Sequence, residues 1–185
     1  EIYAAHPDAA VRRAVLRGFM AAGARDRLAH AARSEADDAL RKEAVQLLGA
    51  AGGIEELRQL YAAEKSPEIR RQIQRALMVG GDAEFVIQAA RTEKDPELRR
   101  DAVRLLGAMG SANAAEALAA MYPTERDPEI RQAIIDGLFH RGDARTLVDL
   151  ARKETDPQLR KRIVERLARM KSKEATEYLM EVLEP

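Results

Sequence analysis

The stretch Asp95-Pro96-Glu97-Leu98-Arg99 recurs with small changes along the whole chain. Close copies lie at Ser66-Pro67-Glu68-Ile69-Arg70, Asp127-Pro128-Glu129-Ile130-Arg131 and Asp156-Pro157-Gln158-Leu159-Arg160, and weaker copies begin at Asp8 and Asp37. We call the first residue of each copy its anchor. The anchors fall at positions 8, 37, 66, 95, 127 and 156, in steps of 29, 29, 29, 32 and 29 residues. A fixed period of this length is the signature of a stacked repeat array.

Each repeat is predicted to hold two helices. An anchor Asp or Ser is a good N-cap, because its side-chain oxygen accepts from free N–H groups of the first turn, and Pro suits the first helical position. Apolar residues such as Leu98, Ala102 and Leu106 follow at helical spacing. Glycines are predicted to close the first helices. They are Gly23, Gly52-Gly53, Gly80-Gly81, Gly110 and Gly142, and the stretch from Gly107 to Gly110 is interpreted as a turn.

A second period is superposed on the first. The residue five positions before each anchor alternates between Tyr and Ala: Tyr3, Ala32, Tyr61, Ala90, Tyr122 and Ala151. We infer that a two-repeat unit was duplicated, so that three doublets begin at positions 8, 66 and 127. The tyrosines are predicted to pack between repeats, where their bulk complements the small alanines of the other class.

The repeats resemble short HEAT repeats of the type named after phycobilisome lyases. The resemblance covers the chain from Asp8 onward and is clearest at Asp95, Pro96, Leu98, Arg99, Ala102, Val103 and Leu106-Gly107. It implies an all-α, right-handed α-solenoid of about six two-helix repeats, used by most relatives as a protein-binding scaffold. A few relatives of this kind act on bilin chromophores or on damaged DNA.

The whole chain, residues 1–185, is predicted to be one repeat domain. Residues 1–7 match the end of a second helix and are interpreted as the remnant of a preceding repeat. Terminal repeats need a polar outer face, and four acids near the carboxyl end are candidates for it: Glu174, Glu177, Glu181 and Glu184. The chain is therefore expected to be the C-terminal part of a longer array.

Composition narrows the range of functions. Lys and Arg number 31, as do Asp and Glu, so the formal net charge of zero argues against nucleic acid as the partner. There is no cysteine, which excludes disulfides and thiolate sites. No apolar run approaches the roughly 18–20 residues that span a bilayer, so membrane insertion is not expected. These features do not distinguish cytoplasm from periplasm.

One arginine recurs four residues after every anchor, and we call this set the ladder arginines. They are Arg12, Arg41, Arg70, Arg99, Arg131 and Arg160. A phosphate- or carboxylate-binding row is one interpretation. A structural role is preferred, in which each pairs with an acid of its own or the next repeat, because every repeat has one. The anchor acids are likewise assigned to N-caps rather than to acid–base chemistry.

No catalytic, metal or cofactor site is predicted. His6, His30 and His140 lie in different repeats at different offsets, without the i, i+4 spacing of zinc ligands. No Ser or Thr lies in a nucleophile motif. No cofactor is therefore expected, and a small-molecule ligand is disfavoured.

The polar face of the second helices is the candidate partner-binding surface, since in HEAT-like arrays this face lines the concave side. Side chains at equivalent offsets there vary in type, as expected of a recognition surface. The candidates are Arg33, Gln59, Gln88, Arg91, Asp149 and Arg152, with His30 at the same offset as Gln59. The sequence therefore predicts a non-enzymatic scaffold that binds protein along this face. The alternatives are a bilin-lyase-like or other ligand-handling protein, and a DNA-binding protein with a local Arg stripe.

Overall fold

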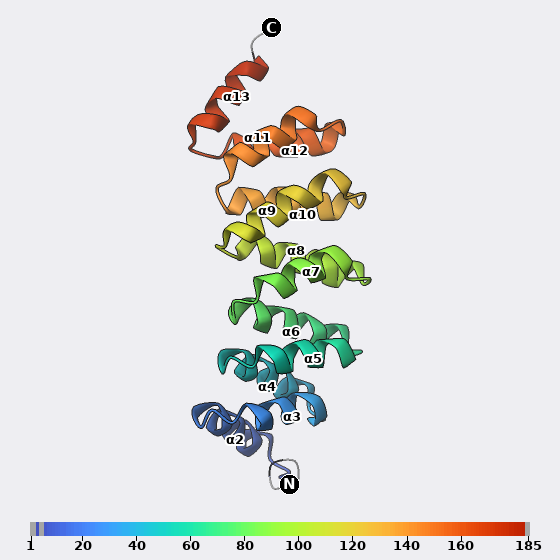
Figure 1. Cartoon of the computed structure of the whole chain (residues 1–185), viewed down its shortest axis with the longest axis vertical. Helices are drawn as coiled ribbons and strands as arrows, with labels where there is room; N and C mark the ends of the chain where they lie inside the picture. Colours follow the sequence, from blue (N-terminus) through green and yellow to red (C-terminus); the bar gives the residue numbers. More distant parts are fainter. Residues whose placement is uncertain (1–2, 4–5, 184–185) are drawn as a thin grey trace. The chain divides into compact units, whose positions relative to one another are not determined.

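The computed structural model describes residue 3 and residues 6–183, and these form twelve α-helices, one 3-10 helix and no strand (Figure 1). The helices are α2 (Ala9–Ala21), α3 (Arg25–Ser34), α4 (Asp38–Ala50), α5 (Ile54–Ala63), α6 (Pro67–Val79), α7 (Ala83–Thr92), α8 (Pro96–Ala108), α9 (Ala112–Met121), η1 (Tyr122–Thr124), α10 (Pro128–His140), α11 (Ala144–Lys153), α12 (Pro157–Leu167) and α13 (Lys173–Leu183). Each of the six anchors precedes one pair of helices, which confirms the all-α prediction. The right-handed winding stays a prediction.

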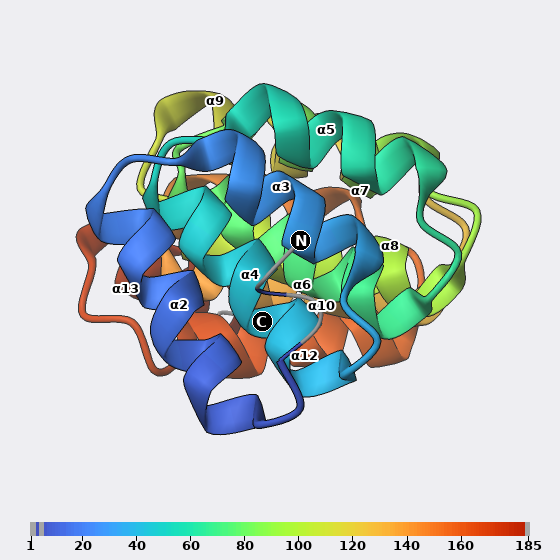
Figure 2. The same cartoon turned by 90° about the horizontal axis from the view of Figure 1, so that it is seen from below.

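The chain divides into two compact units, Glu1–Phe85 and Val86–Pro185, with the division inside α7. In the first unit α4 lies beside α6, and α3 lies beside α5 (Figure 2). In the second unit α8, α10 and α12 pack in succession. The interpretation of residues 1–7 as a remnant and the proposed cap at Glu184 fall largely or wholly outside the described residues.

The anchors cap the first helices, as the sequence predicted. The Asp95 carboxylate accepts from the N–H groups of Glu97 and Leu98 at 2.9 and 3.1 Å. The hydroxyl of Ser66 accepts from Ile69 at 3.4 Å. Asp8, Asp37, Asp127 and Asp156 cap their helices in the same way.

Four of the predicted glycine stops are confirmed by left-handed backbone conformations, with φ between 66° and 83°: Gly23, Gly52, Gly81 and Gly142. The fourth repeat differs, because Met109 in extended conformation ends α8 and Gly110 is not left-handed. The interpretation of Gly107 as part of a turn was wrong. It lies inside α8, where the absence of a side chain allows α10 to approach.

The three additional residues of the 32-residue step lengthen one second helix. Helix α5 has 10 residues, and its counterpart α9 has 10 residues followed directly by the three of η1. Because the addition amounts to about one turn of a 3-10 helix, the apolar face stays in register. Leu118 and Tyr122 are buried, as Leu57 and Tyr61 are in α5.

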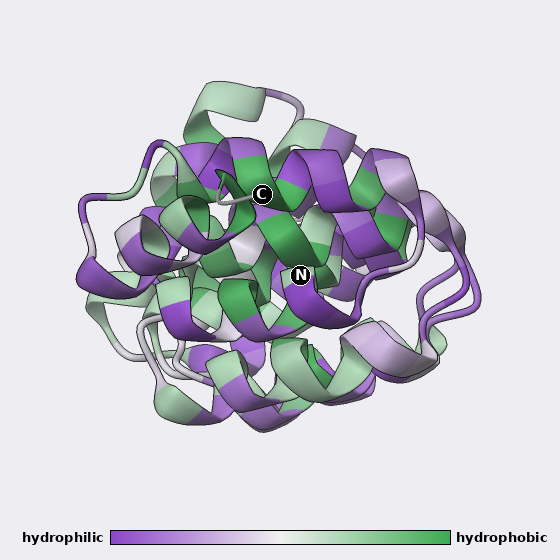
Figure 3. Ribbon diagram, turned by 90° about the horizontal axis from the view of Figure 1, so that it is seen from above, coloured by the Kyte–Doolittle hydropathy of each residue, from purple (hydrophilic) through white to green (hydrophobic). Residues whose placement is uncertain are grey.

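Each unit buries a continuous apolar core between its helices. Leu16, Leu40 and Ile73 are fully buried in the first unit, and Leu106 and Ile134 in the second. Individual helices carry both hydrophobic and hydrophilic positions (Figure 3), the pattern of helices that stack on neighbours through one face. Since helices of 10 to 13 residues are marginal alone in water, this stacking supplies most of their stability.

Two pairs of first helices come unusually close. A Cβ atom built on Gly107 of α8 would lie 2.6 Å from the Cα atom of Gly137 on α10. A Cβ atom on Gly49 of α4 would lie 2.9 Å from the Cβ atom of Ala76 on α6. In both pairs the anchor-plus-12 glycine of one repeat meets a small anchor-plus-10 residue of the next. Close packing between first helices is therefore seen where the repeat anchored at residue 37 or 95 meets the next repeat.

Candidate functional site

A glutamate stands two residues before the anchor of each repeat from the second onward. The side chains of Glu35, Glu64, Glu125 and Glu154 are only 1–6% exposed. One carboxylate oxygen of each accepts from the N–H group of the following anchor, at 2.8 Å for Glu154 and Asp156. Glu93 makes the same bond to Asp95 at 3.1 Å. We call these five residues the glutamate column.

Four ladder arginines, Arg12, Arg41, Arg99 and Arg131, reach this column from the first helix of the same repeat. Arg12 lies 3.3 Å from Glu35, and Arg131 lies 2.5 Å from Glu154. Arg41 pairs with Glu64 and Arg99 with Glu125 in the same way. Arg70 lies 4.3 Å above the ring of Tyr61, and Arg160 is exposed on α12. These contacts tie the two helices of a repeat to the turn that starts the next repeat.

The Tyr/Ala alternation corresponds to two ways of joining successive repeats. At two of the three junctions where the preceding second helix carries Ala, the arginine Nε donates to that residue's carbonyl oxygen: Arg41 to Ala32 at 2.9 Å and Arg99 to Ala90 at 3.2 Å. Where it carries Tyr122, the phenol instead donates to Glu154. The guanidinium of Arg131 then lies 4.5 Å above the Tyr122 ring.

The other two tyrosines also contact the following repeat. Tyr3 donates to Glu35 at 2.6 Å. Tyr61 accepts from the buried Gln74 at 2.9 Å and meets the Phe85 ring edge-on at 4.9 Å. The prediction that the tyrosines pack between repeats is therefore confirmed.

Alkaline pH is expected to weaken the Tyr122 junction. Burial, followed by the hydrogen bond to Glu154, raises the pKa of Tyr122 above its ordinary value of about 10. Above that pH the unfolded chain releases a phenolic proton that the folded chain retains, so stability falls as pH rises. One proton sets a limit of about 1.4 kcal/mol per pH unit.

The check is urea unfolding from pH 8 to 11 of the wild type and of Tyr122→Phe. The decline of the free energy of unfolding above pH 10 should be shallower in the variant. Part of the decline should remain, because the pKa of Tyr3 is also raised. Parallel curves for the two proteins would show that Tyr122 does not contribute.

The first helices carry a second kind of clamp, in which two arginines of one helix hold one acid of its neighbour. Asp136 of α10 accepts from Arg162 and Arg166 of α12 at 2.6 and 2.8 Å. Burial opposes ionisation of Asp136, but these two hydrogen bonds prevail and lower its pKa. In the first unit Arg13 and Arg17 hold Glu43 at 2.7 and 3.2 Å.

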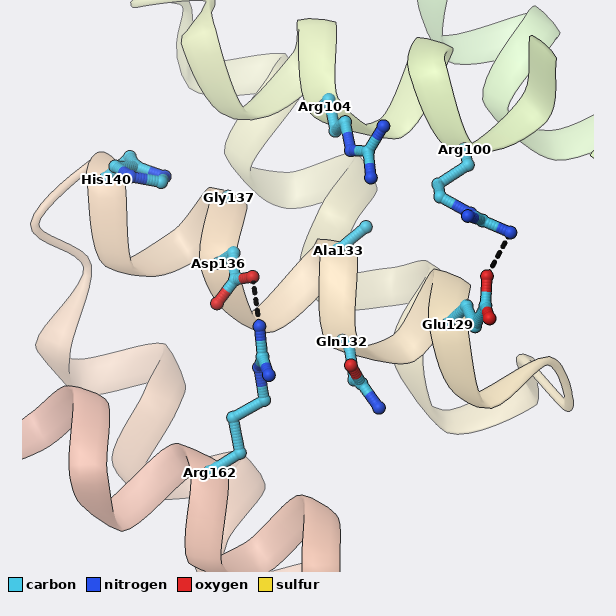
Figure 4. A pocket seen from close by; sticks show the side chains of 9 residues that line it. All are labelled: Arg100, Arg104, Glu129, Gln132, Ala133, Asp136, Gly137, His140 and Arg162. Carbon is cyan, nitrogen blue, oxygen red and sulfur yellow. Dashed lines mark hydrogen bonds and ion pairs between the residues drawn. The ribbon is translucent and has the colours of Figure 1, made fainter. Parts of the chain in front are cut away.

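A groove of about 550 Å³ lies on the first-helix face of the second unit (Figure 4). It is lined by three helices, α8, α10 and α12. Its residues are Arg100, Arg104, Glu129, Gln132, Ala133, Asp136, Gly137, His140 and Arg162. Sequence reasoning placed the candidate surface on the second helices and did not single out this face.

The predicted second-helix residues are all exposed: Arg33, Gln59, Gln88, Arg91, Asp149 and Arg152. Within the described part of the chain, no hydrogen bond or ion pair joins one of these six residues to another of the six. Arg91 lines an open depression of about 470 Å³ beside Arg99 and Glu125. Arg152 pairs with Glu181 at 2.6 Å and lies near the Tyr178 ring. Within each unit these residues are separate polar positions and do not share one pocket.

Neither a metal centre nor a membrane span emerges from the described residues. No group of three or more His, Cys, Asp or Glu side chains there could hold a metal ion. No helix among those residues is both long and apolar enough to cross a membrane.

Sequence reasoning did not recognise the glutamate column as a set, although the signal was present. All five stand two residues before an anchor, and that fixed offset would have identified the arginine partners. The double-arginine clamps have no such signal, because they occur at different offsets in the two units.

The fold and these repeated clamps define an α-helical repeat protein. Residues 83–152 match the family model of HEAT repeats, and this segment belongs to that family. The lyase-type subtype is not specified by the match. A search of curated proteins finds no match to the chain. HEAT repeats are typically used for protein interaction.

Proposed function

We propose that this chain is a non-enzymatic scaffold that binds a protein partner along its second-helix face. The observation that supports this proposal is a contrast between two sets of equivalent positions. The ladder and the glutamate column repeat one chemistry in repeat after repeat, as a structural element does. The second-helix candidates occupy equivalent exposed positions but differ in charge and size. Side chains that vary on regularly repeated helices suit the recognition of an irregular protein surface.

The perturbed titratable groups support a structural rather than a catalytic reading. The pKa of Asp82 is lowered mainly by its hydrogen bonds with Arg58, and Asp136 is held by two arginines. Both acids are occupied in ion pairs: Asp82, just before α7, with Arg58 of α5, and Asp136 of α10 with two arginines of α12. Structural ion pairs perturb pKa values as active sites do, and neither acid is paired with a candidate nucleophile.

The test compares three baits in a lysate of the source organism, read by mass spectrometry. The first is the whole chain, and the second carries Arg33→Glu, Arg91→Glu and Arg152→Glu. The third is a control with the same charge change at exposed arginines elsewhere: Arg75→Glu, Arg126→Glu and Arg169→Glu.

A protein held by the first and third baits, and reduced at least about ten-fold on the second, is the expected result. Equal retention of the protein on all three baits would show that the contact does not lie on the second helices. Absence of any enriched protein would count against the scaffold itself. A change in bilin absorbance, or salt-dependent binding of duplex DNA, would favour the ligand-handling or the DNA-binding alternative.

A further inference from the structure

The groove on the first helices has a floor of small residues and walls of long polar ones. Ala133 and Gly137 of α10 form the floor. Arg104 of α8 and Arg162 of α12 stand on opposite sides of α10 (Figure 4). The hollow exists because these two α10 positions carry little or no side chain, while both neighbouring helices contribute arginines.

Several donors at this groove remain available to a ligand. The Arg104 side chain is 60% exposed, and its one ion pair is a 3.3 Å contact with Asp101 on the same helix. The Gln132 side chain also lines the groove and carries two amide N–H donors. Pairs at i, i+3 on an exposed helix face are worth only a few tenths of a kcal/mol. Arg104 can therefore exchange its partner readily.

The charges at the groove favour a single anionic group over a continuous polyanion. Arg162 and Arg166 hold Asp136, and Arg100 is paired with Glu129 at the rim. The residues that line the groove include three arginines, Arg100, Arg104 and Arg162, and two acids, Glu129 and Asp136, a surplus of one positive charge. A nucleic-acid backbone would bring successive phosphates against these acids, whereas spaced carboxylates avoid them.

We propose that this groove is a second interaction surface, which binds a carboxylate side chain of an acidic segment in a partner protein. Arg104 supplies a charge-assisted, fork-shaped pair of donors, and the Gln132 amide supplies a third from the adjacent helix. The segment lies across α10, over Ala133. Like the proposed function, this is binding of a protein partner, but it uses the first helices instead of the second helices. The two can therefore be tested separately.

The test is fluorescence anisotropy of the whole chain with a labelled peptide of alternating Glu and Ala. Arg104→Gln is expected to weaken binding about ten-fold, because a hydrogen bond to a charged group is worth about 1.5–3 kcal/mol. Ala133→Met fills the groove without changing charge and should also weaken binding. The matched control is Arg145→Gln on α11, which removes one charge from an exposed arginine of the same unit. Circular dichroism confirms that each variant is folded.

Three outcomes would overturn the proposal. One is an equal loss in Arg145→Gln, which would mean non-specific attraction. Another is undiminished binding of the same peptide with Gln in place of Glu. The third is duplex DNA that displaces the peptide and binds more tightly, which would identify the face as a nucleic-acid surface. The triple second-helix variant should bind the peptide like wild type, so failure of the proposed function would be seen separately.

Discussion

Replacing Glu154 by Ala is expected to lower the free energy of unfolding by about 3 kcal/mol. Its carboxylate is the shared acceptor for the Tyr122 hydroxyl, the Arg131 guanidinium and the Asp156 N–H group. Removing one member of a buried pair typically costs about 3–5 kcal/mol, because it leaves an uncompensated charge. The Arg131 side chain keeps 22% exposure, so solvent relieves part of that penalty and the lower end applies.

The measurement is urea unfolding followed by circular dichroism, with hydrogen exchange to locate the change. The control is Glu165→Ala on α12, whose exposed carboxylate lies 4.0 Å from Lys161 and should contribute under about 1 kcal/mol. Adding Tyr122→Phe should cost less in the Glu154→Ala background than in wild type, because both changes remove the same bond. Strictly additive losses would show that the three groups do not act as one network.

Replacing Gly107 by Ala is expected to destabilise the second unit by about 2 kcal/mol. The new methyl group would lie 2.6 Å from the Cα atom of Gly137, a separation that requires the two helix backbones to move apart. Overpacking of this kind typically costs about 1–3 kcal/mol. The higher helix propensity of Ala, about 0.5–1 kcal/mol, offsets only part of it.

The same substitution at Gly18 is expected to have the opposite sign. Gly18 is an exposed residue inside α2, and a methyl group there meets no other atom within 4 Å. Gly18→Ala should therefore stabilise the chain by about 0.5–1 kcal/mol through helix propensity alone. Thermal and urea unfolding of both variants test the pair. Two stabilising outcomes would mean that α8 and α10 accommodate the methyl group without separating.

The sequence was sufficient to predict the local structure, because short-range signals within each repeat mark where its helices begin and end. The anchors cap helices wherever they occur, and four of the five predicted stops hold a left-handed glycine. Gly107 was misread because a glycine near a helix end has two uses. It can close the helix, or it can allow another backbone to approach, and only the position of Gly137 distinguishes them.

The candidate site was less predictable, because it depends on contacts between repeats. The ladder arginines were recognised as a row from their spacing alone. Their alternating environments depend on whether Tyr122 or Ala90 ends the preceding helix. The groove was missed because Ala133 and Gly137 are ordinary helix residues in sequence. They form a floor only when Arg104 and Arg162 stand on either side.

The two close approaches between first helices, at Gly49 and at Gly107, limit how such a gene can change in length. A repeat of the Gly49 or Gly107 kind carries Leu47 or Leu105 at its own anchor-plus-10 position. If a single repeat of this kind were copied in tandem, that leucine would replace the small residue against which the glycine packs. Its branched side chain would separate the two backbones. Insertion or loss of DNA encoding two repeats preserves every junction, so surviving length variants should differ by an even number of repeats.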